Sequence, residues 1–152
     1  MTSSHPTRYV RPGRSMNVFN QAVAALARAG VSLLGSRELR VLGRTSGEWR
    51  TTPVNLLTVD GQQYLLAPRG HVQWTHNMRA AGGGELRLGK NVDVFTATEV
   101  ADDDKVPLLR AYLKRWKAEV GVFFNGVGPD SPDADLRRIA PDHPVFLITV
   151  RS

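Results

Sequence analysis

Residues 43 to 53 set the pattern for the chain on either side of them, and they read Gly43-Arg44-Thr45-Ser46-Gly47-Glu48-Trp49-Arg50-Thr51-Thr52-Pro53. This segment holds two arginines and four hydroxyl side chains within eleven residues, and a strand-like run precedes and follows it. Arginine presents a planar fork of donors that matches phosphate, and the hydroxyls and free N–H groups of a turn add short neutral donors. The segment therefore predicts a phosphate-binding turn between two strands. An exposed polar turn without a ligand has the same composition, so that interpretation stays open.

The segment matches neither of the common nucleotide-binding motifs. It contains no Gly-Lys-Ser/Thr of a Walker loop, and the chain has no Gly-x-Gly-x-x-Gly dinucleotide fingerprint. A further cation, Arg69, stands between Pro68 and Gly70 at the end of the next predicted hairpin. Because a hairpin brings strand ends together, Arg69 is expected to converge on the same anion. Trp74, which follows, could stack on a planar ring or pack in the core.

Strand-like segments joined by short turns extend on both sides of this turn. Asp60-Gly61 is typical of a tight hairpin, and Pro53 predicts an edge or a bulge, where a missing N–H is tolerated. The glycine run at 82–84 is expected to end a helix. The predicted strands are Glu38 to Arg44, Arg50 to Val59, Gln62 to Ala67, Glu85 to Leu88, Val92 to Val100 and an apolar closing strand from Val145 to Val150.

Apolar residues at helical spacing predict helices over Ser15 to Ala29, His71 to Ala81 and Asp102 to Val120. Residues 121–143 are expected to loop, with one helical turn after Ser131-Pro132. Hairpins with interposed helices, rather than regular strand–helix alternation, predict an α+β, mainly β fold built as a small barrel. We expect a mobile basic arm over residues 1–14 and a single domain over residues 15–152.

The composition limits the partners and the compartment. A formal net charge of +6 fits an acidic partner, which could be a polyanionic cofactor, nucleic acid or an anionic membrane, and it fits equally a soluble surface that is rich in arginine. The absence of cysteine excludes disulfides and a cysteine nucleophile, and it fits a reducing cytoplasm. The N-terminal residues lack the apolar core of a signal peptide. Four scattered histidines form no metal-ligand pattern, so we expect a cytoplasmic protein without a metal.

The order of these motifs resembles the deazaflavin-dependent nitroreductase family, which belongs to the split β-barrel flavin and deazaflavin oxidoreductases. The resemblance covers about residues 39–100 and rests on several elements in order. These elements are Gly43-Arg44-x-Ser46-Gly47-x-x-Arg50-x-x-Pro53, then a hairpin, then Arg69-Gly70, then Trp74-x-x-Asn77. The resemblance implies a split β-barrel and hydride transfer between coenzyme F420 and a planar, electron-poor acceptor.

By this resemblance, Arg44, Ser46 and Arg50 would hold the phosphate and acidic tail of F420. Arg69 would match a basic contact that is commonly lysine, and the ring and ribityl part would lie against Pro53, Trp74 and Asn77. The full set of cofactor-binding candidates is Arg44, Thr45, Ser46, Arg50, Thr51, Thr52, Pro53, Pro68, Arg69, Gly70, Trp74 and Asn77.

The chain also departs from its relatives. Thr45 stands where many of them carry lysine, and the link from Gly70 to Trp74 is shorter than in the type member. Asn55 stands where a substrate-facing tyrosine is often found, and it could instead satisfy a neighbouring backbone group. The acceptor also needs a proton, for which Tyr112, His71 and water are candidates.

Two other functions fit parts of the pattern. Flavin mononucleotide (FMN) shares a ribityl phosphate with F420, so the same arginines would serve an FMN-binding reductase. A non-catalytic module for anionic ligands or nucleic acid is the second alternative, but the basic residues form no stripe and no nucleic-acid motif is present. The expected partners are an apolar small-molecule acceptor and a second copy of the chain. The helix from Ser15 to Ala29 could pack on the domain, touch a membrane or cover the acceptor.

Overall fold

The computed structural model describes residues 35–151, with the side chains of all but residues 118–120. The arm predicted for residues 1–14 and the helix predicted for Ser15 to Ala29 lie outside these residues. Within them, no helix is long and apolar enough to cross a membrane.

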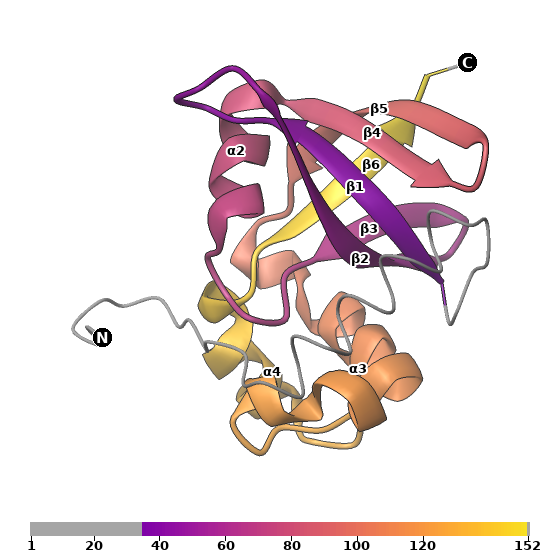
Figure 1. The fold of residues 1–152 in the computed structure, drawn as a ribbon. Coiled ribbons are helices and arrows are strands. Elements are labelled where there is room, and N and C mark those ends of the chain that lie inside the picture. Colours follow the sequence, from indigo (N-terminus) through magenta and orange to yellow (C-terminus); the bar gives the residue numbers. More distant parts are fainter. Residues whose placement is uncertain (1–34, 152) are drawn as a thin grey trace.

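A closed antiparallel barrel forms the body of the described structure (Figure 1), and its strand order is β1-β2-β3-β6-β5-β4. Sequential hairpins join β1 to β2, β2 to β3 and β4 to β5, as the turn signals predict. The last strand, β6, closes the barrel between β3 and β5. The strands are β1 (Ser36–Leu42), β2 (Trp49–Val59), β3 (Gln62–Leu66), β4 (Gly83–Leu88), β5 (Asn91–Glu99) and β6 (Val145–Val150).

Pro53 occupies a part of β2 that has one strand neighbour. It lies opposite Glu38 of β1, whereas the pairing of β2 with β3 begins at Leu56. The N–H that proline lacks therefore interrupts no second ladder, which confirms the predicted edge position.

The glycine run differs from its predicted role. Only Gly82 ends the preceding helix, with a left-handed φ of 74°, while Gly83 and Gly84 already belong to β4. A Cβ at Gly83 would overlap the carbonyl oxygen of Phe95, and one at Gly84 would overlap that of Arg40. These two glycines therefore let β4 approach both of its neighbours closely, and the strand starts earlier than the predicted Glu85.

One helix packs beside β1 and β4, and the other helices lie together below the barrel in the view of Figure 1. The helix predicted from Asp102 to Val120 is divided at Lys105, because Pro107 is tolerated only in a first turn. Residues 121–143 contain a helix after Ser131-Pro132, as predicted. The helical elements are α2 (Gln73–Ala81), η1 (Asp102–Asp104), α3 (Val106–Val120), η2 (Gly121–Phe124), α4 (Asp133–Ile139) and η3 (Ala140–Asp142).

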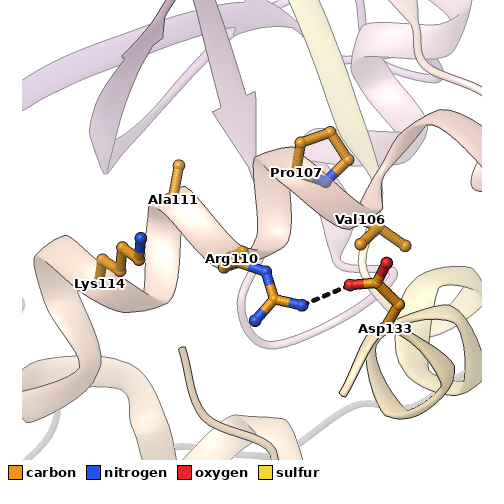
Figure 2. A pocket seen from close by; sticks show the side chains of 6 residues that line it. All are labelled: Val106, Pro107, Arg110, Ala111, Lys114 and Asp133. Carbon is orange, nitrogen blue, oxygen red and sulfur yellow. Dashed lines mark hydrogen bonds and ion pairs between the residues drawn. The ribbon is translucent and has the colours of Figure 1, made fainter. Parts of the chain in front are cut away.

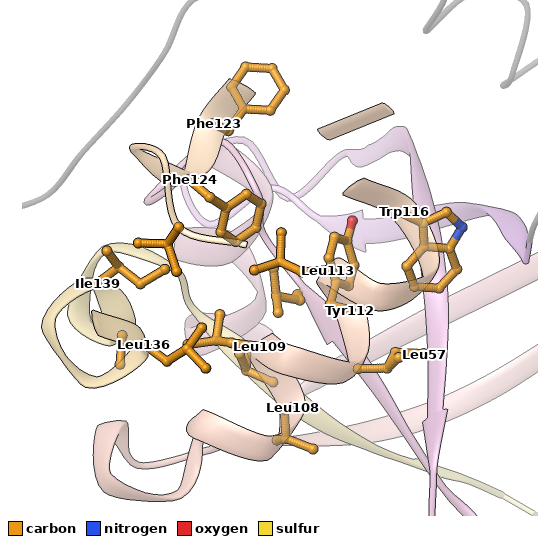
Figure 3. Close-up of a cluster of buried hydrophobic side chains, with 14 residues drawn as sticks. Leu57, Leu108, Leu109, Tyr112, Leu113, Trp116, Phe123, Phe124, Leu136 and Ile139 are labelled. Atoms are coloured by element: carbon orange, nitrogen blue, oxygen red, sulfur yellow. The ribbon is translucent and has the colours of Figure 1, made fainter. Parts of the chain in front are cut away.

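Two hydrophobic clusters hold these layers together. The first fills the barrel with Leu39, Phe95 and their neighbours, and Met78 of α2 enters it. The second packs α3, η2 and α4 against Leu57 and Leu66 of the barrel wall (Figure 3). Because α2 shares the barrel core, its outer face is held in a fixed place beside the turn between β1 and β2.

Candidate functional site

The turn between β1 and β2 is a closed loop with its own hydrogen bonds. The N–H of Gly43 donates to the carbonyl of Glu48 at 2.8 Å, and the N–H of Gly47 donates to the carbonyl of Gly43 at 2.9 Å. Gly47 has a φ of 72°, which favours glycine. The Ser46 hydroxyl accepts from the N–H of Glu48 at 3.1 Å. The sequence therefore folds here into a rigid turn with an exposed outer surface.

Gly43 leaves a space in which donor groups gather. A Cβ at this position would lie 2.8 Å from the Ser46 Oγ and 3.6 Å from the Arg50 Nε. Glycine thus allows the hydroxyl and the guanidinium to approach the same side of the loop. Such a set of donors suits a phosphate oxygen.

Arg44 is fixed on α2 by two amide side chains. Its Nη1 donates to Asn77 Oδ1 at 2.7 Å and to Gln73 Oε1 at 2.9 Å, and its backbone N–H donates to the same Asn77 oxygen at 3.1 Å. Asn77 is 5% exposed, so the loss of its oxygen would leave Arg44 without its main anchor. The predicted role of Asn77 at the ring stays a prediction, while the structure shows that it positions Arg44.

The charge of Arg44 is not neutralised by these partners. Asn77 and Gln73 are neutral, and no carboxylate within residues 35–151 pairs with this guanidinium. Arg50 is exposed and makes no hydrogen bond or ion pair in the same part of the chain. Two cations with open donors therefore flank the turn, which fits an oxyanion of two or more negative charges.

The other predicted contacts on β2 lie on both faces of the strand. Thr51 is exposed, and Thr52 is half-buried. Val54 and Leu56 point into the barrel core, so Asn55 shares the opposite face with Pro53, as period-two alternation predicts. The Ser36 hydroxyl donates to Asn55 Oδ1 at 3.3 Å, so part of the amide serves a neighbouring strand.

Two predicted cofactor contacts follow β3, and they lie in different surroundings. The Arg69 guanidinium lies over the ring of Phe123, 5.8 Å from its centroid, on the side of the helical cluster. Trp74 is half-buried, with its ring centroid 5.8 Å from that of Phe146 in the barrel. The predicted convergence of Arg69 with Arg44 and the predicted stacking of Trp74 on the cofactor both stay predictions.

His71 bridges two elements and does not present a free ring nitrogen. Its Nε2 lies 2.8 Å from the carbonyl oxygen of Pro141, so this nitrogen must carry the hydrogen. Its Nδ1 lies 3.3 Å from Arg79 Nη2 and accepts there. Both ring nitrogens of His71 therefore have partners, and its predicted role as a proton donor stays a prediction.

Tyr112 lies in the helical core. It is 1% exposed, and its ring centroid lies 4.8 Å from that of Trp116 and 6.2 Å from that of Phe124 (Figure 3). The Tyr112 ring therefore packs in the helical core, and its predicted role as a proton donor stays a prediction.

His76 belongs to this region although the sequence patterns did not identify it. Burial first, and then the positive charges of Arg79 and Arg44, lower the pKa of His76 below its usual range. The helical spacing of Gln73, His76 and Asn77 is the signal that would have found it, because these positions share one face.

A pocket of about 340 Å³ lies elsewhere, between α3 and the start of α4 (Figure 2). Arg110 on its wall donates to Asp133 Oδ1 at 2.6 Å and to the carbonyls of Pro129 and Ser131 at 2.7 and 2.9 Å. Its charge is therefore paired. None of the cofactor-binding candidates lines this pocket, and the site remains with the turn and α2.

Solved structures with related folds place the barrel in a known class. An F420-H2 dependent reductase (FDR-A) is 17% identical with a TM-score of 0.51, over 76% of this chain and 94% of its own. A structure described as a domain-swapped dimer is 19% identical with a TM-score of 0.53, over 90% and 94%. A FAD-binding protein from Mesorhizobium loti is 13% identical with a TM-score of 0.51, over 84% and 86%. These likenesses show the fold alone, and it is the predicted split β-barrel.

No curated protein matches the sequence. The model of the F420H(2)-dependent quinone reductase family matches residues 16–127, which include the turn, α2 and all of α3. The match covers well over half of the chain and confirms the resemblance to the deazaflavin-dependent reductases. The chain therefore belongs to the F420H(2)-dependent quinone reductase family and is an oxidoreductase that uses coenzyme F420.

Proposed function

We propose that this chain reduces a flat, electron-poor acceptor of the quinone or nitroaromatic class with F420H2. The observation that carries the proposal is Arg44, which two amide oxygens hold in place without cancelling its charge. Reduced F420 supplies the hydride when it is bound. The protein supplies binding, orientation and electrostatics.

Each residue of the turn has a defined task in this proposal. Arg44 and Arg50 bind the phosphate and acidic tail, and Ser46 adds a neutral donor. Thr45 and Thr51 present exposed hydroxyls beside them. Because hydrogen bonds from Arg44 to Asn77 fix the turn on α2, these donors are held in position before the ligand binds. This lowers the entropy cost of binding.

Asn55 is the proposed contact for the acceptor. Hydride transfer requires the reacting faces to lie within about 3–3.5 Å of one another, which favours a planar acceptor. Asn55 uses its oxygen toward Ser36 and keeps its amide N–H groups for a carbonyl or nitro oxygen. An amide stabilises developing negative charge but does not deliver a proton readily, so we assign the proton to water.

Arg50→Ala is expected to weaken F420 binding by about ten- to a hundredfold, because a hydrogen bond to a charged group contributes roughly 1.5–3 kcal/mol. Folding should survive, since Arg50 is exposed and bonds to nothing in the described residues. The measurement is a fluorescence titration of F420 at low salt. Arg138→Ala on α4, whose guanidinium pairs with Asp135, is the matched control.

The same titration tests the proposed function against its rivals. Tighter binding of FMN than of F420 would favour the flavin-binding reductase. Tight binding of single-stranded nucleic acid without any cofactor binding would favour the non-catalytic module. Binding of F420 without reduction of any quinone or nitroaromatic would refute the proposed acceptor class.

We also propose that two copies pair through the outer face of β1, β4 and β5. Val94 of β5 is 39% exposed there, Leu42 and Val92 add further apolar area, and Trp49 at the start of β2, opposite Leu42, is 44% exposed beside them. The Arg40–Glu85 ion pair of 2.9 Å lies in the same cross-strand row as Val94, and its two opposite charges are self-complementary in a two-fold pair. A related fold is described as a domain-swapped dimer, which supports a second copy as the occupant.

Val94→Lys is expected to convert the dimer to a monomer, because a charge would be buried in the apolar part of the interface. Light scattering after gel filtration measures the mass, and the single chain has 16.7 kDa. Val122→Lys is the control, since Val122 is a 70% exposed valine on η2. A monomeric parent protein, or a Val94→Lys dimer, would contradict this interface.

We also propose that the protein is located in the cytoplasm. Absence of cysteine and a need for F420 fit the cytoplasm. Membrane contact through the predicted helix from Ser15 to Ala29 stays a prediction.

A further inference from the structure

Three residues of α2 form one face beside the turn. Gln73, His76 and Asn77 stand at positions i, i+3 and i+4, which are neighbours on a helix surface. The Arg44 guanidinium bonds to the first and the third of them, so it lies across this face. His76 therefore borders the guanidinium that the turn presents to an anion.

The surroundings of His76 are mainly cationic. Arg44 faces it from the turn between β1 and β2, and Arg79 and His71 face it from α2 and the residues before it. The His71 and His76 ring centroids are 6.5 Å apart. Glu99 of β5 is the carboxylate of this region, and it is held by Arg79 through contacts of 2.7 and 2.8 Å.

The backbone of His71 acts on one ring nitrogen of His76 and raises the pKa of the ring, against burial and the neighbouring cations. No hydrogen bond of this ring to another side chain is present within residues 35–151. The second ring nitrogen therefore remains a donor for a ligand when the ring is protonated. Without an anion, the neighbouring cations oppose that protonation.

An oxyanion on Arg44 would change this balance. It would place negative charge next to a ring that now faces Arg44 and Arg79, and opposite charges within a few ångströms favour the protonated form. Binding of the anion and uptake of a proton would then be linked, so each would strengthen the other.

We propose that His76 is a further residue of the anion site, and that it binds an oxyanion of the cofactor in its protonated form, so that cofactor binding takes up a proton at this ring. The oxyanion belongs either to the phosphate or to the carboxylates of the acidic tail. This inference rests on the proposed function, because it takes F420 to be bound at the turn.

Isothermal titration calorimetry tests the proton uptake directly. F420 is titrated into the intact protein at about pH 7 in two buffers of different ionisation enthalpy, which gives the number of protons bound per cofactor. We expect uptake of up to one proton, and an affinity that falls by up to ~10-fold per pH unit as the pH rises through this range. His76→Gln should abolish the uptake, weaken binding at about pH 6 by three- to tenfold, and match the parent at about pH 8.5.

Titration with two truncated deazaflavins identifies which oxyanion faces His76. A deazaflavin that lacks both phosphate and tail should show no uptake. A form with the phosphate but without the tail carboxylates should show full uptake if the phosphate faces His76, and no uptake if the tail does.

Nuclear magnetic resonance of labelled histidine gives a readout that needs no cofactor. Inorganic pyrophosphate should raise the pKa of His76 in the parent protein. Arg79→Gln should raise the pKa of His76 before any ligand is added, because it removes a neighbouring cation.

F420 binding without proton uptake, or uptake that persists in His76→Gln, would overturn the inference. If F420 failed to bind while pyrophosphate still shifted the His76 signal, the proposed function would fail and the anion site would stand. If pyrophosphate and F420 both left His76 unchanged, the inference that His76 belongs to the anion site would be refuted.

Discussion

Replacing Asn77 with aspartate is expected to weaken F420 binding by about ten- to a hundredfold while the protein stays folded. The new carboxylate would lie where Asn77 Oδ1 now accepts from Arg44 at 2.7 Å. It would pair with the guanidinium and also repel the incoming anion. A hydrogen bond to a charged group contributes roughly 1.5–3 kcal/mol, which sets the size of the effect.

Gln73→Glu is the matched control for this change. It places a carboxylate beside the same Arg44 guanidinium, but at an exposed position where solvent screens the charge. We therefore expect a smaller loss of F420 affinity. A fluorescence titration gives the dissociation constants, and thermal melts report the fold. If Asn77→Asp bound F420 as tightly as the parent, Arg44 would not be the anion ligand.

Gly83→Ala is expected to destabilise the protein by about 3 kcal/mol and to lower the melting temperature by roughly 6–12 °C. The added Cβ would overlap the carbonyl oxygen of Phe95. This neighbour is backbone within the β4–β5 ladder, so it cannot move aside as a flexible side chain does. Overpacking against such a group must open the ladder or distort the strand.

Circular dichroism melts measure this effect, with Gly128→Ala as the control. At Gly128 an added Cβ would lie 3.5 Å from the end of the flexible Lys117 side chain, so a change within about 0.5 kcal/mol is expected. Equal melting temperatures for Gly83→Ala and the parent would show that β4 has room to shift at this point.

The strands and hairpins could be predicted because their signals are local. Asp60-Gly61 and the alternation of β2 each lie within a few residues, and the structure follows them. The start of β4 could not be predicted, because the need for Gly83 and Gly84 arises from Phe95 and Arg40 on neighbouring strands.

The site shows the same division between local and distant information. The sequence indicated which side chains could bind phosphate, but not that Arg44 is anchored by Asn77, 33 residues away. The contact of the His71 ring with the carbonyl of Pro141, 70 residues along the chain, could not be predicted either. The burial of Tyr112 has a local signal, because Leu109, Leu113 and Trp116 stand at helical spacing on the same face and are buried with it.

The position of β6 has a consequence for how the chain reaches its native state. This strand pairs with β3 on one side and β5 on the other, and Leu66 lies opposite Val145, far along the chain. Contacts of such long sequence separation form late and slow the folding reaction. Until they form, β3 and β5 present open edges to other molecules. A newly made chain therefore depends on its final strand for protection against aggregation, and we expect the interval before β6 inserts to be the period in which a chaperone matters most.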